Sequence, residues 1–285
     1  MQSRDEETDG MIHRPTLIYR NAKTLLRGFL FVLSIIMMTS IAEAGGPPIT
    51  NADDLLNAID NTSGNLHDFT ANMRYTKEQG LLGDIQTRTG KLYYLNDEEA
   101  SVRQFFVHFS ELRMGDTIEK ESHDFIFDGR WLVERINDEK QFIRREVVRP
   151  GETFDPLAVD GPFPLPIGQS REAVLKRFSA KLLSAEMDGR LKGFYKLELK
   201  PKSQVRIGDG GQDDLLDESI VDLTLWYDPK TLLPAQVVVD EENGDIKTVK
   251  LAKVKVNKGI KESLFDTTAP GPNDGWRVTV EPYRR

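Results

Sequence analysis

Alternating apolar and polar positions predict three short strands within residues 124–148. The apolar run FIF leads into Asp128-Gly129, a dipeptide typical of two-residue hairpins because both turn positions need a positive φ. Residues 131–136 then form the return strand, and residues 141–148 form a third strand rich in β-branched and aromatic side chains. The stretch predicts an antiparallel meander that must bury one of its faces.

The same two-residue period recurs on both sides of this meander. It predicts further strands at residues 69–76, 85–95, 101–112, 182–187, 194–199, 221–227, 235–239 and 246–256. Short polar turns separate these strands, and no repeat of fixed period or internal linker divides them. We therefore expect about ten consecutive antiparallel strands in one domain.

Two short segments have the helical period instead. The first is capped by Thr50 or Asn51 and places Leu55, Leu56 and Ile59 on one face. The second covers residues 170–178 and is capped by Ser170, with Val174, Leu175 and Phe178 on one side. These two segments are the only helices that we expect in the mature domain.

Two irregular stretches interrupt the strands. Residues 150–168 are rich in proline, which cannot donate to a strand ladder, so we expect them to cross over the surface or between elements. Residues 203–218 are rich in Gly and Asp. We interpret them as a solvated loop, with Ca²⁺ binding by the carboxylates of residues 209–218 as the alternative.

Such a wide antiparallel sheet must curl, because twisted open sheets of about ten strands rarely stay flat. One face of the sheet is apolar, and a helix covers a stripe of only roughly 10 Å. Two short helices would therefore leave apolar surface on the concave side, which is a site for an apolar ligand. The alternative is that the aromatic side chains simply fill the core of a barrel or sandwich.

The residues expected to line this apolar trough share the inward-facing positions of the strands. They are Phe69, Met73, Tyr75, Leu92, Tyr94, Phe105, Val107, Phe109, Leu197, Leu223, Leu225, Val237 and Val239. Trp131 and Trp226 are interpreted as packed aromatic residues and not as specific ligand contacts.

The N-terminal sequence predicts secretion. Basic residues precede an apolar run at residues 28–41 that is too short to span a bilayer comfortably, and Ala42-Glu43-Ala44 has the small-x-small pattern of a cleavage site. We read residues 1–44 as a signal peptide, cleaved after Ala44, and residues 45–285 as one mature domain in the periplasm. Acidic residues before Met11 suit a signal poorly, so translation can begin at Met11; an uncleaved membrane anchor is the alternative.

Composition excludes several kinds of partner and chemistry. The net charge of -8 argues against nucleic acid, which requires Lys and Arg to neutralise its phosphates. The chain has no cysteine, which removes disulfides, thiolate metal sites and a Cys nucleophile. The four histidines, His13, His67, His108 and His123, have no metal-binding spacing, and no GxSxG, P-loop or GxGxxG motif occurs in context. We expect no enzymatic activity, no cofactor and no metal.

The order of these elements resembles the LolA type of periplasmic outer-membrane lipoprotein carrier. The resemblance covers about residues 52–271 and is carried by LHDFTA at 66–71, GKLYY at 90–94, FDGRW at 127–131, FYKLELKP at 194–201, Asp228-Pro229, Leu232-Leu233-Pro234, Phe265 and Pro270-Gly271. One difference is that the family's Arg-Pro pair, whose Arg locks the helical lid, is replaced by Leu95-Asn96-Asp97. Arg103 is the candidate substitute.

The resemblance implies a mainly β domain, a single curled antiparallel sheet that forms an unclosed half-barrel, with two short helices over the concave apolar face. It implies a monomer without a cofactor that receives acylated lipoprotein or lipid cargo from an inner-membrane release complex and delivers it to an outer-membrane acceptor. The alternatives are an envelope lipid-sensing or regulatory binding module on the same scaffold, or a secreted hydrolase.

Overall fold

The computed structural model describes residues 48–97, 102–148, 157, 163–202 and 220–283. The chain divides into two units, residues 1–46 and 47–285, and all described residues belong to the second unit. The predicted signal peptide and the acidic loop at 203–218 lie outside the described residues.

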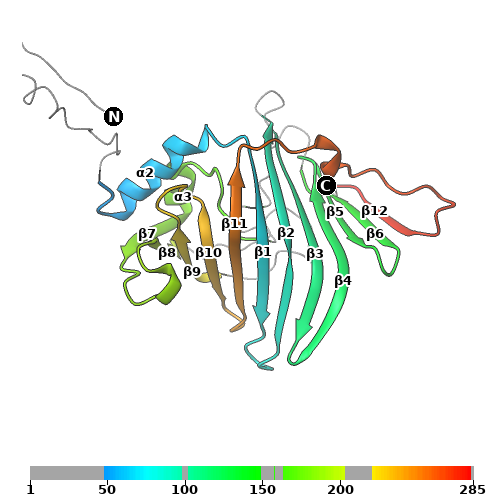
Figure 1. The fold of residues 1–285 in the computed structure, drawn as a ribbon, viewed down its shortest axis with the longest axis horizontal. Helices are drawn as coiled ribbons and strands as arrows, with labels where there is room; N and C mark the ends of the chain where they lie inside the picture. Colours follow the sequence, from blue (N-terminus) through cyan, green and yellow to red (C-terminus); the bar gives the residue numbers. More distant parts are fainter. Residues whose placement is uncertain (1–47, 98–101, 149–156, 158–162, 203–219, 284–285) are drawn as a thin grey trace, which may run out of the picture. The chain divides into compact units, whose positions relative to one another are not determined.

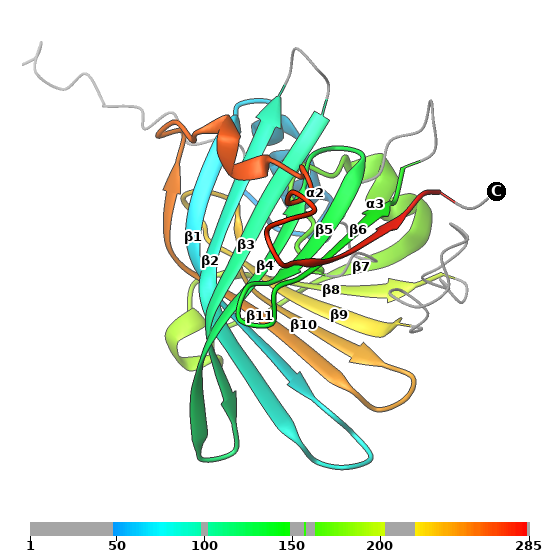
Figure 2. The same ribbon diagram turned by 90° about the vertical axis from the view of Figure 1, so that its right-hand side faces the viewer.

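The described strands form one twelve-stranded sheet that is not closed into a barrel (Figures 1 and 2). Its order is β12-β6-β5-β4-β3-β2-β1-β11-β10-β9-β8-β7, so β12 and β7 are the two edges. All neighbouring strands are antiparallel except β12 and β6, which are parallel. The expected curled, unclosed antiparallel sheet is confirmed.

The strands alternate between buried and less buried positions along most of their lengths. The first six are β1 (Asp68–Glu78), β2 (Ile85–Asp97), β3 (Val102–Met114), β4 (Thr117–Phe127), β5 (Trp131–Ile136) and β6 (Gln141–Glu146). The others are β7 (Phe178–Leu183), β8 (Tyr195–Pro201), β9 (Ile220–Tyr227), β10 (Pro234–Glu241), β11 (Ile246–Val256) and β12 (Arg277–Glu281).

Two α-helices lie on the face of the sheet that we call the inner face. In α2 (Ala52–Ser63), the side chain of Asn51 accepts a hydrogen bond from the Asp54 backbone N–H at 2.9 Å, and one apolar stripe is buried. In α3 (Arg171–Arg177), Ser170 accepts from the Ala173 backbone N–H at 3.2 Å. Both predicted helices are confirmed. Two short 3₁₀ helices, η1 (Gly189–Leu191) and η2 (Glu262–Phe265), lie in connections.

The hairpin at Asp128-Gly129 differs from the two-residue turn that the sequence predicts. Three residues separate β4 from β5, and Gly129 alone has a positive φ, +102°. The carboxylate of Asp128 accepts hydrogen bonds from the backbone N–H groups of Arg130 and Trp131 at 2.8 and 2.7 Å. This side-chain turn stabilises a longer connection, which explains why the dipeptide signal gave the wrong length.

The outer face of the sheet is not polar and solvent-exposed throughout. A second apolar cluster forms there from Ile126, Val133 and Phe142, and Phe265 of η2 packs against it. The C-terminal segment then continues into β12, a strand that the sequence pattern missed. Its five residues, Arg-Val-Thr-Val-Glu, alternate between polar and apolar, but β12 pairs in parallel with β6 at the sheet edge and leaves Val278 and Val280 38% and 50% exposed.

Candidate functional site

The sequence-predicted lining residues do share the inner face, and the structure brings them together in one apolar cluster. Twelve of the thirteen are buried, with exposed fractions of 0 to 2%, and Tyr75 is partly buried against the same cluster. Leu55, Leu56 and Ile59 of α2 and Val174 of α3 cover part of this surface. The face is therefore the apolar one that the alternation predicts, but it is not exposed as an open trough.

The described part of the proline-rich stretch covers more of this face. We call residues 163–167 (FPLPI) the plug segment; Phe163, Leu165 and Ile167 are at most 4% exposed and belong to the inner apolar cluster. Leu157 belongs to it as well and is 1% exposed. The sequence predicts that this stretch crosses over the surface or between elements. Its described residues run between elements.

Phe163 is the centre of this packing. Its ring lies 5.2 Å from that of Phe125 and 6.0 Å from that of Phe105, both nearly edge-on. The rings of Tyr75 and Phe109 are 6.0 and 6.1 Å away. Aromatic rings favour such edge-to-face pairs. Phe163 therefore lies on the concave apolar face where the sequence predicts a site for an apolar ligand.

The plug segment is irregular for a reason visible in its sequence. The backbone N–H of Leu165 donates to the Phe163 carbonyl at 2.7 Å, and that of Ile167 donates to the Leu165 carbonyl at 2.6 Å. Pro164 and Pro166 need no such partner, because proline has no N–H. Two successive three-residue turns therefore satisfy the segment's own donors without any strand ladder.

Arg103 and the two helices hold the end of the plug segment. An Nη atom of Arg103, on β3, donates to the Gly168 carbonyl at 2.5 Å, directly after the segment. The backbone N–H of Arg171 donates to Asp60 of α2 at 3.2 Å, and its guanidinium pairs with Asp53 at 2.7 Å. The residue that the sequence analysis named as a substitute lock thus contacts the backbone between the segment and α3.

An apolar pocket opens beside the end of the plug segment. Its volume is about 310 Å³, at the small end of the range for ligand sites. It lies between the C-terminal end of α2, the β9–β10 turn and the end of β11. Its apolar lining includes Ile59, Leu66, Ile167, Leu233 and Val256. None of these residues was among the predicted lining set, because they come from loops and element ends without the strand period.

A row of alternating charges borders the apolar centre on the inner side of β4, where His123 is the partner of Phe109. His123 lies 3.4 Å from Glu121 and 3.0 Å from Glu134. Arg88 extends the row by pairing with Glu121 at 3.0 Å. At the other end Arg145 pairs with Glu134 at 3.4 Å and with Glu281 of β12 at 2.8 Å.

The two glutamates of this row determine the charge of His123. Burial opposes the protonated ring, but hydrogen bonds and charges of Glu121 and Glu134 outweigh it and raise the pKa of His123 to about 9. In turn, His123 is the main cause of a lowered pKa at Glu134, although burial of that carboxyl acts in the opposite direction. His123 is therefore a cation at neutral pH, bound between two carboxylates.

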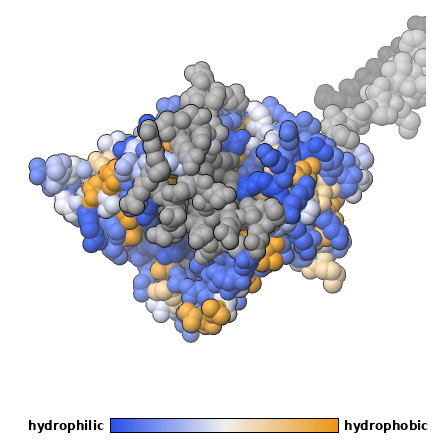
Figure 3. Space-filling view, turned by 180° about the vertical axis from the view of Figure 1, so that it is seen from behind, coloured by the Kyte–Doolittle hydropathy of each residue, from blue (hydrophilic) through white to orange (hydrophobic). Residues whose placement is uncertain are grey.

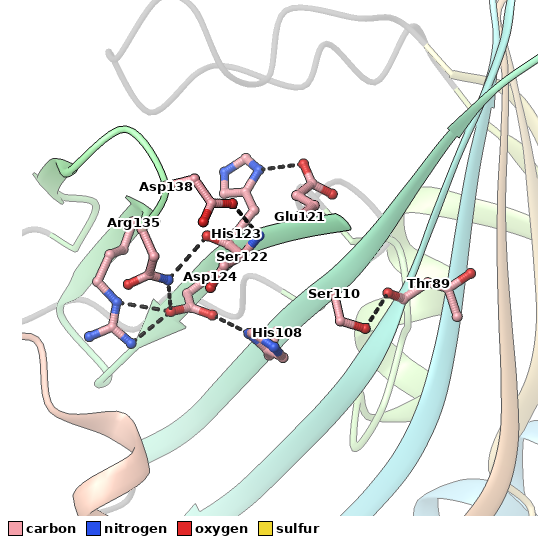
Figure 4. A network of polar contacts seen from close by, with 10 residues as sticks. Thr89, His108, Ser110, Glu121, Ser122, His123, Asp124, Arg135 and Asp138 are labelled. Atoms are coloured by element: carbon pink, nitrogen blue, oxygen red, sulfur yellow. Dashed lines mark hydrogen bonds and ion pairs between the residues drawn. The ribbon is translucent and has the colours of Figure 1, made fainter. Parts of the chain in front are cut away.

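A separate polar cluster lies on the outer side, around Asp124 (Figure 4). Arg135 donates to its carboxylate at 2.7 and 2.9 Å, Asn137 donates at 2.8 Å, and His108 lies 2.6 Å away. Burial raises the pKa of Asp124, but these hydrogen bonds outweigh burial and lower it. Every oxygen of this buried carboxylate is partnered, which is typical of a structural cluster that fixes β3, β4 and β5.

Sequence reasoning missed Phe163, Leu165 and Ile167 as members of the inner face. Their apolar side chains alternate with Pro164 and Pro166, a pattern that could have indicated an extended buried segment. Trp226 is a packed residue as expected: it is 7% exposed, and its indole N–H donates to Asp188 at 2.7 Å. Among the described residues, no group of His, Asp or Glu is arranged to bind a metal, and no helix has the length and apolar character to cross a membrane.

Neither a known sequence family nor a curated protein matches the chain. Solved structures with a similar fold include an uncharacterized conserved protein from Thermus thermophilus, 11% identical, which covers 81% of this chain and 99% of its own with a TM-score of 0.43. An outer membrane lipoprotein-sorting protein domain from Vibrio parahaemolyticus is 12% identical and covers 75% and 96%, with a TM-score of 0.37.

A LolA superfamily protein from Nitrosomonas europaea is 11% identical and covers 76% of this chain and 98% of its own, with a TM-score of 0.35. At these identities and TM-scores the comparisons concern the fold alone.

Proposed function

We propose that this protein is a periplasmic carrier that binds acyl chains of lipoproteins, or free lipids, at its inner face and moves them toward the outer membrane. The observation that carries the proposal is how the inner face is covered. In the described part of the chain, one open sheet buries its apolar side under two short helices and the irregular plug segment, and no second sheet packs on it. A cover of this kind can be exchanged for another apolar chain without breaking any strand ladder.

The free energy lost when the plug segment leaves the inner face would be similar to the free energy gained when an acyl chain replaces it. Burying three large apolar side chains, as the plug segment does, is worth roughly 5–9 kcal/mol at about 1.5–3 kcal/mol each. An acyl chain gains about 0.8 kcal/mol per buried CH₂, so about six to eleven methylene groups would offset the loss. Binding and release can then both occur, which is what a carrier requires.

The apolar pocket is the proposed entry point. It opens next to Ile167, the last residue of the plug segment, so a chain that enters there meets the segment at its end. Arg103 holds the Gly168 carbonyl at the same place. Entry of an acyl chain would therefore be coupled to release of this hydrogen bond, and no catalytic group would be needed.

The test is direct binding and transfer. The mature protein, freed of lipid, is mixed with a dansyl-labelled fatty acid, and bound species from the freshly purified protein are identified by mass spectrometry. We expect saturable fluorescence, co-purified acyl species and passage of the label to acceptor vesicles. Absence of both bound acyl species and saturable binding would overturn the proposal.

A pair of variants tests the position of the site. Leu233→Glu places a charge in the pocket wall, whereas Val221→Glu places one on β9 at a position that is 50% exposed. We expect Leu233→Glu to weaken label binding at least tenfold and Val221→Glu to leave it unchanged. Circular dichroism melting of both variants checks that each is folded.

The filled inner face favours a second candidate, an envelope lipid-sensing or regulatory module on the same scaffold. Such a module would bind lipid and change a protein contact without passing the lipid on. It predicts bound acyl species with no transfer to vesicles, together with a stable protein partner. The transfer step of the experiment therefore separates the two candidates.

A further inference from the structure

Large apolar side chains are exposed at the ends of two adjacent hairpins. In the β1–β2 turn, Leu81 is 92% and Leu82 is 73% exposed. In the neighbouring β3–β4 hairpin, Met114 is 40% and Ile118 is 51% exposed. The two hairpins are neighbours because β2 pairs with β3, with Gln86 opposite Met114. Both project at the lower end of the sheet in Figures 1 and 2, and Figure 3 shows apolar residues gathered there.

These positions contribute nothing to the inner apolar core. Leu81 and Leu82 follow Gly80, outside any strand, and scattered surface leucines are ordinary, but a gathering on adjacent turns marks an interaction site. Ile85, the first residue of β2, is 49% exposed and extends the same patch. We call these five residues, Leu81, Leu82, Ile85, Met114 and Ile118, the apolar tip.

A basic hollow lies directly above the apolar tip on the outer face. It has a volume of about 360 Å³ and is lined by residues of β1, β2, β3 and β11. The lining residues are Arg74, Thr76, Thr87, Thr89, Glu111, Arg113, Thr248 and Lys250. Three cations and one carboxylate give this hollow a positive balance in a chain whose net charge is -8.

The cations of the hollow are available to a ligand. Within the described part of the chain, Arg74, Arg113 and Lys250 form no ion pair or side-chain hydrogen bond with another residue. The hydroxyls of Thr76 and Thr87 contact each other at 3.0 Å, which leaves each with further hydrogen-bonding capacity. Guanidinium, ammonium and hydroxyl donors converging on one hollow are the groups that bind phosphate oxygens.

The tip and the hollow are contiguous. Arg113 precedes Met114 in the chain, and Ile118 is its partner across the β3–β4 ladder. On the other side, Arg113 is opposite Thr87, two residues from Ile85. Since a strand rises about 3.4 Å per residue, the cations lie only one or two residues above the apolar side chains. This is the order of a bilayer surface, in which phosphates lie above the acyl region.

We propose that the apolar tip and the basic hollow together form a docking surface for a phospholipid bilayer. Leu81 and Leu82 enter the interface, and Arg74, Arg113 and Lys250 contact the lipid phosphates. Apolar insertion and attraction of the cations to anionic lipid act together in such contacts. The surface is distinct from the inner face, so docking does not depend on whether the protein carries lipid.

The test is sedimentation of the mature protein with vesicles of phosphatidylcholine and phosphatidylglycerol. We expect co-sedimentation that weakens as salt increases, because the electrostatic part is screened. The double variant Leu81→Asp and Leu82→Asp should bind the vesicles at least tenfold more weakly. Met187→Asp is the matched control, since Met187 is 95% exposed in a different connection, and it should bind like wild type.

A second set of variants tests the cations of the hollow. The double variant Arg113→Ser with Lys250→Ser is compared with Lys255→Ser, a control at an exposed position of β11 outside the hollow. The double variant should lose vesicle binding and most of the salt dependence of that binding, and Lys255→Ser should keep both. Absence of vesicle binding by wild type, or equal binding by all variants, would overturn the proposal. Tight calorimetric binding of inorganic phosphate without vesicle binding would overturn it in favour of a soluble anion.

Uptake of the dansyl-labelled fatty acid by the same variants separates this proposal from the carrier function. Since no residue of the tip or of the hollow's mutated cations belongs to the inner apolar cluster, each variant should retain wild-type uptake. Vesicle binding by a protein that neither takes up the fatty acid nor co-purifies with acyl species would support the docking surface and reject the carrier. Uptake without vesicle binding would reject the docking surface and leave lipid binding at the inner face in place.

Discussion

The inner side of the sheet is built in two different ways. Its centre is held by apolar packing around Phe163, whereas the charged row from Arg88 on β2 to Glu281 on β12 holds its margin. Apolar contacts have no fixed direction, so another hydrocarbon can replace those of the plug segment. Ion pairs need specific partners at specific distances. Under the proposed carrier function, exchange of apolar chains would therefore take place at the centre, and the charged margin would keep the sheet in shape.

Phe163→Ala breaks the apolar centre and should have the largest effect. Removing a buried phenylalanine typically costs about 3–5 kcal/mol, and here four aromatic rings lose their shared partner. Urea unfolding followed by circular dichroism measures the loss. Phe163→Leu, which keeps most of the apolar volume, should cost clearly less. A cost below about 1 kcal/mol for the alanine variant would show that the ring is not the centre of the packing.

Arg103→Gln tests the link between the plug segment and the sheet. A hydrogen bond from a charged group contributes about 1.5–3 kcal/mol, so stability should fall by that order. Hydrogen exchange at Leu165 and Ile167 should increase at the same time, because their donors are satisfied only within the segment. Arg130→Gln, at a more exposed ion pair, serves as the comparison. Unchanged exchange would mean that Arg103 does not restrain the segment.

The charged row should respond to pH, with the smallest effect. The pKa of His123 is raised to about 9 in the folded state, so its stabilising contribution is complete below about pH 6.5 and is lost as pH rises through about 9. We expect the free energy of unfolding to decline by on the order of 1 kcal/mol over this pH range, after allowance for solvent screening. Urea unfolding at several pH values measures it. His123→Gln should remove this part of the pH dependence, and Phe163→Ala should retain it.

The strand period predicted much of the fold. Because side chains alternate across a sheet, every residue of the expected trough set lies on the inner face, Phe69 and Val237 among them. Local capping signals at Asn51 and Ser170 likewise located both helices. The strand β12 was not predicted, although Val278 and Val280 give it the two-residue period, because the sequence does not show that this segment pairs with β6.

The candidate site was only partly predictable. Two helices are too few to cover the sheet, as the sequence predicts, but the nonregular plug segment covers more of its inner face. Proline content showed that residues 163–167 would not form a strand, but it could not show on which side of the sheet they lie. The pocket beside Ile167 and Leu233 is made from four separate connections, so no pattern within one segment of the sequence could predict it.

The sequence by itself determined which side chains share a face, where the helices begin, and that the sheet has one apolar side. These properties depend on neighbours a few residues apart. Only the tertiary structure decided that Phe163 fills the concave centre, that Arg103 reaches Gly168, and that the apolar tip meets a basic hollow. These contacts join residues distant in the chain, and their energies depend on how the sheet curls and not on any local period.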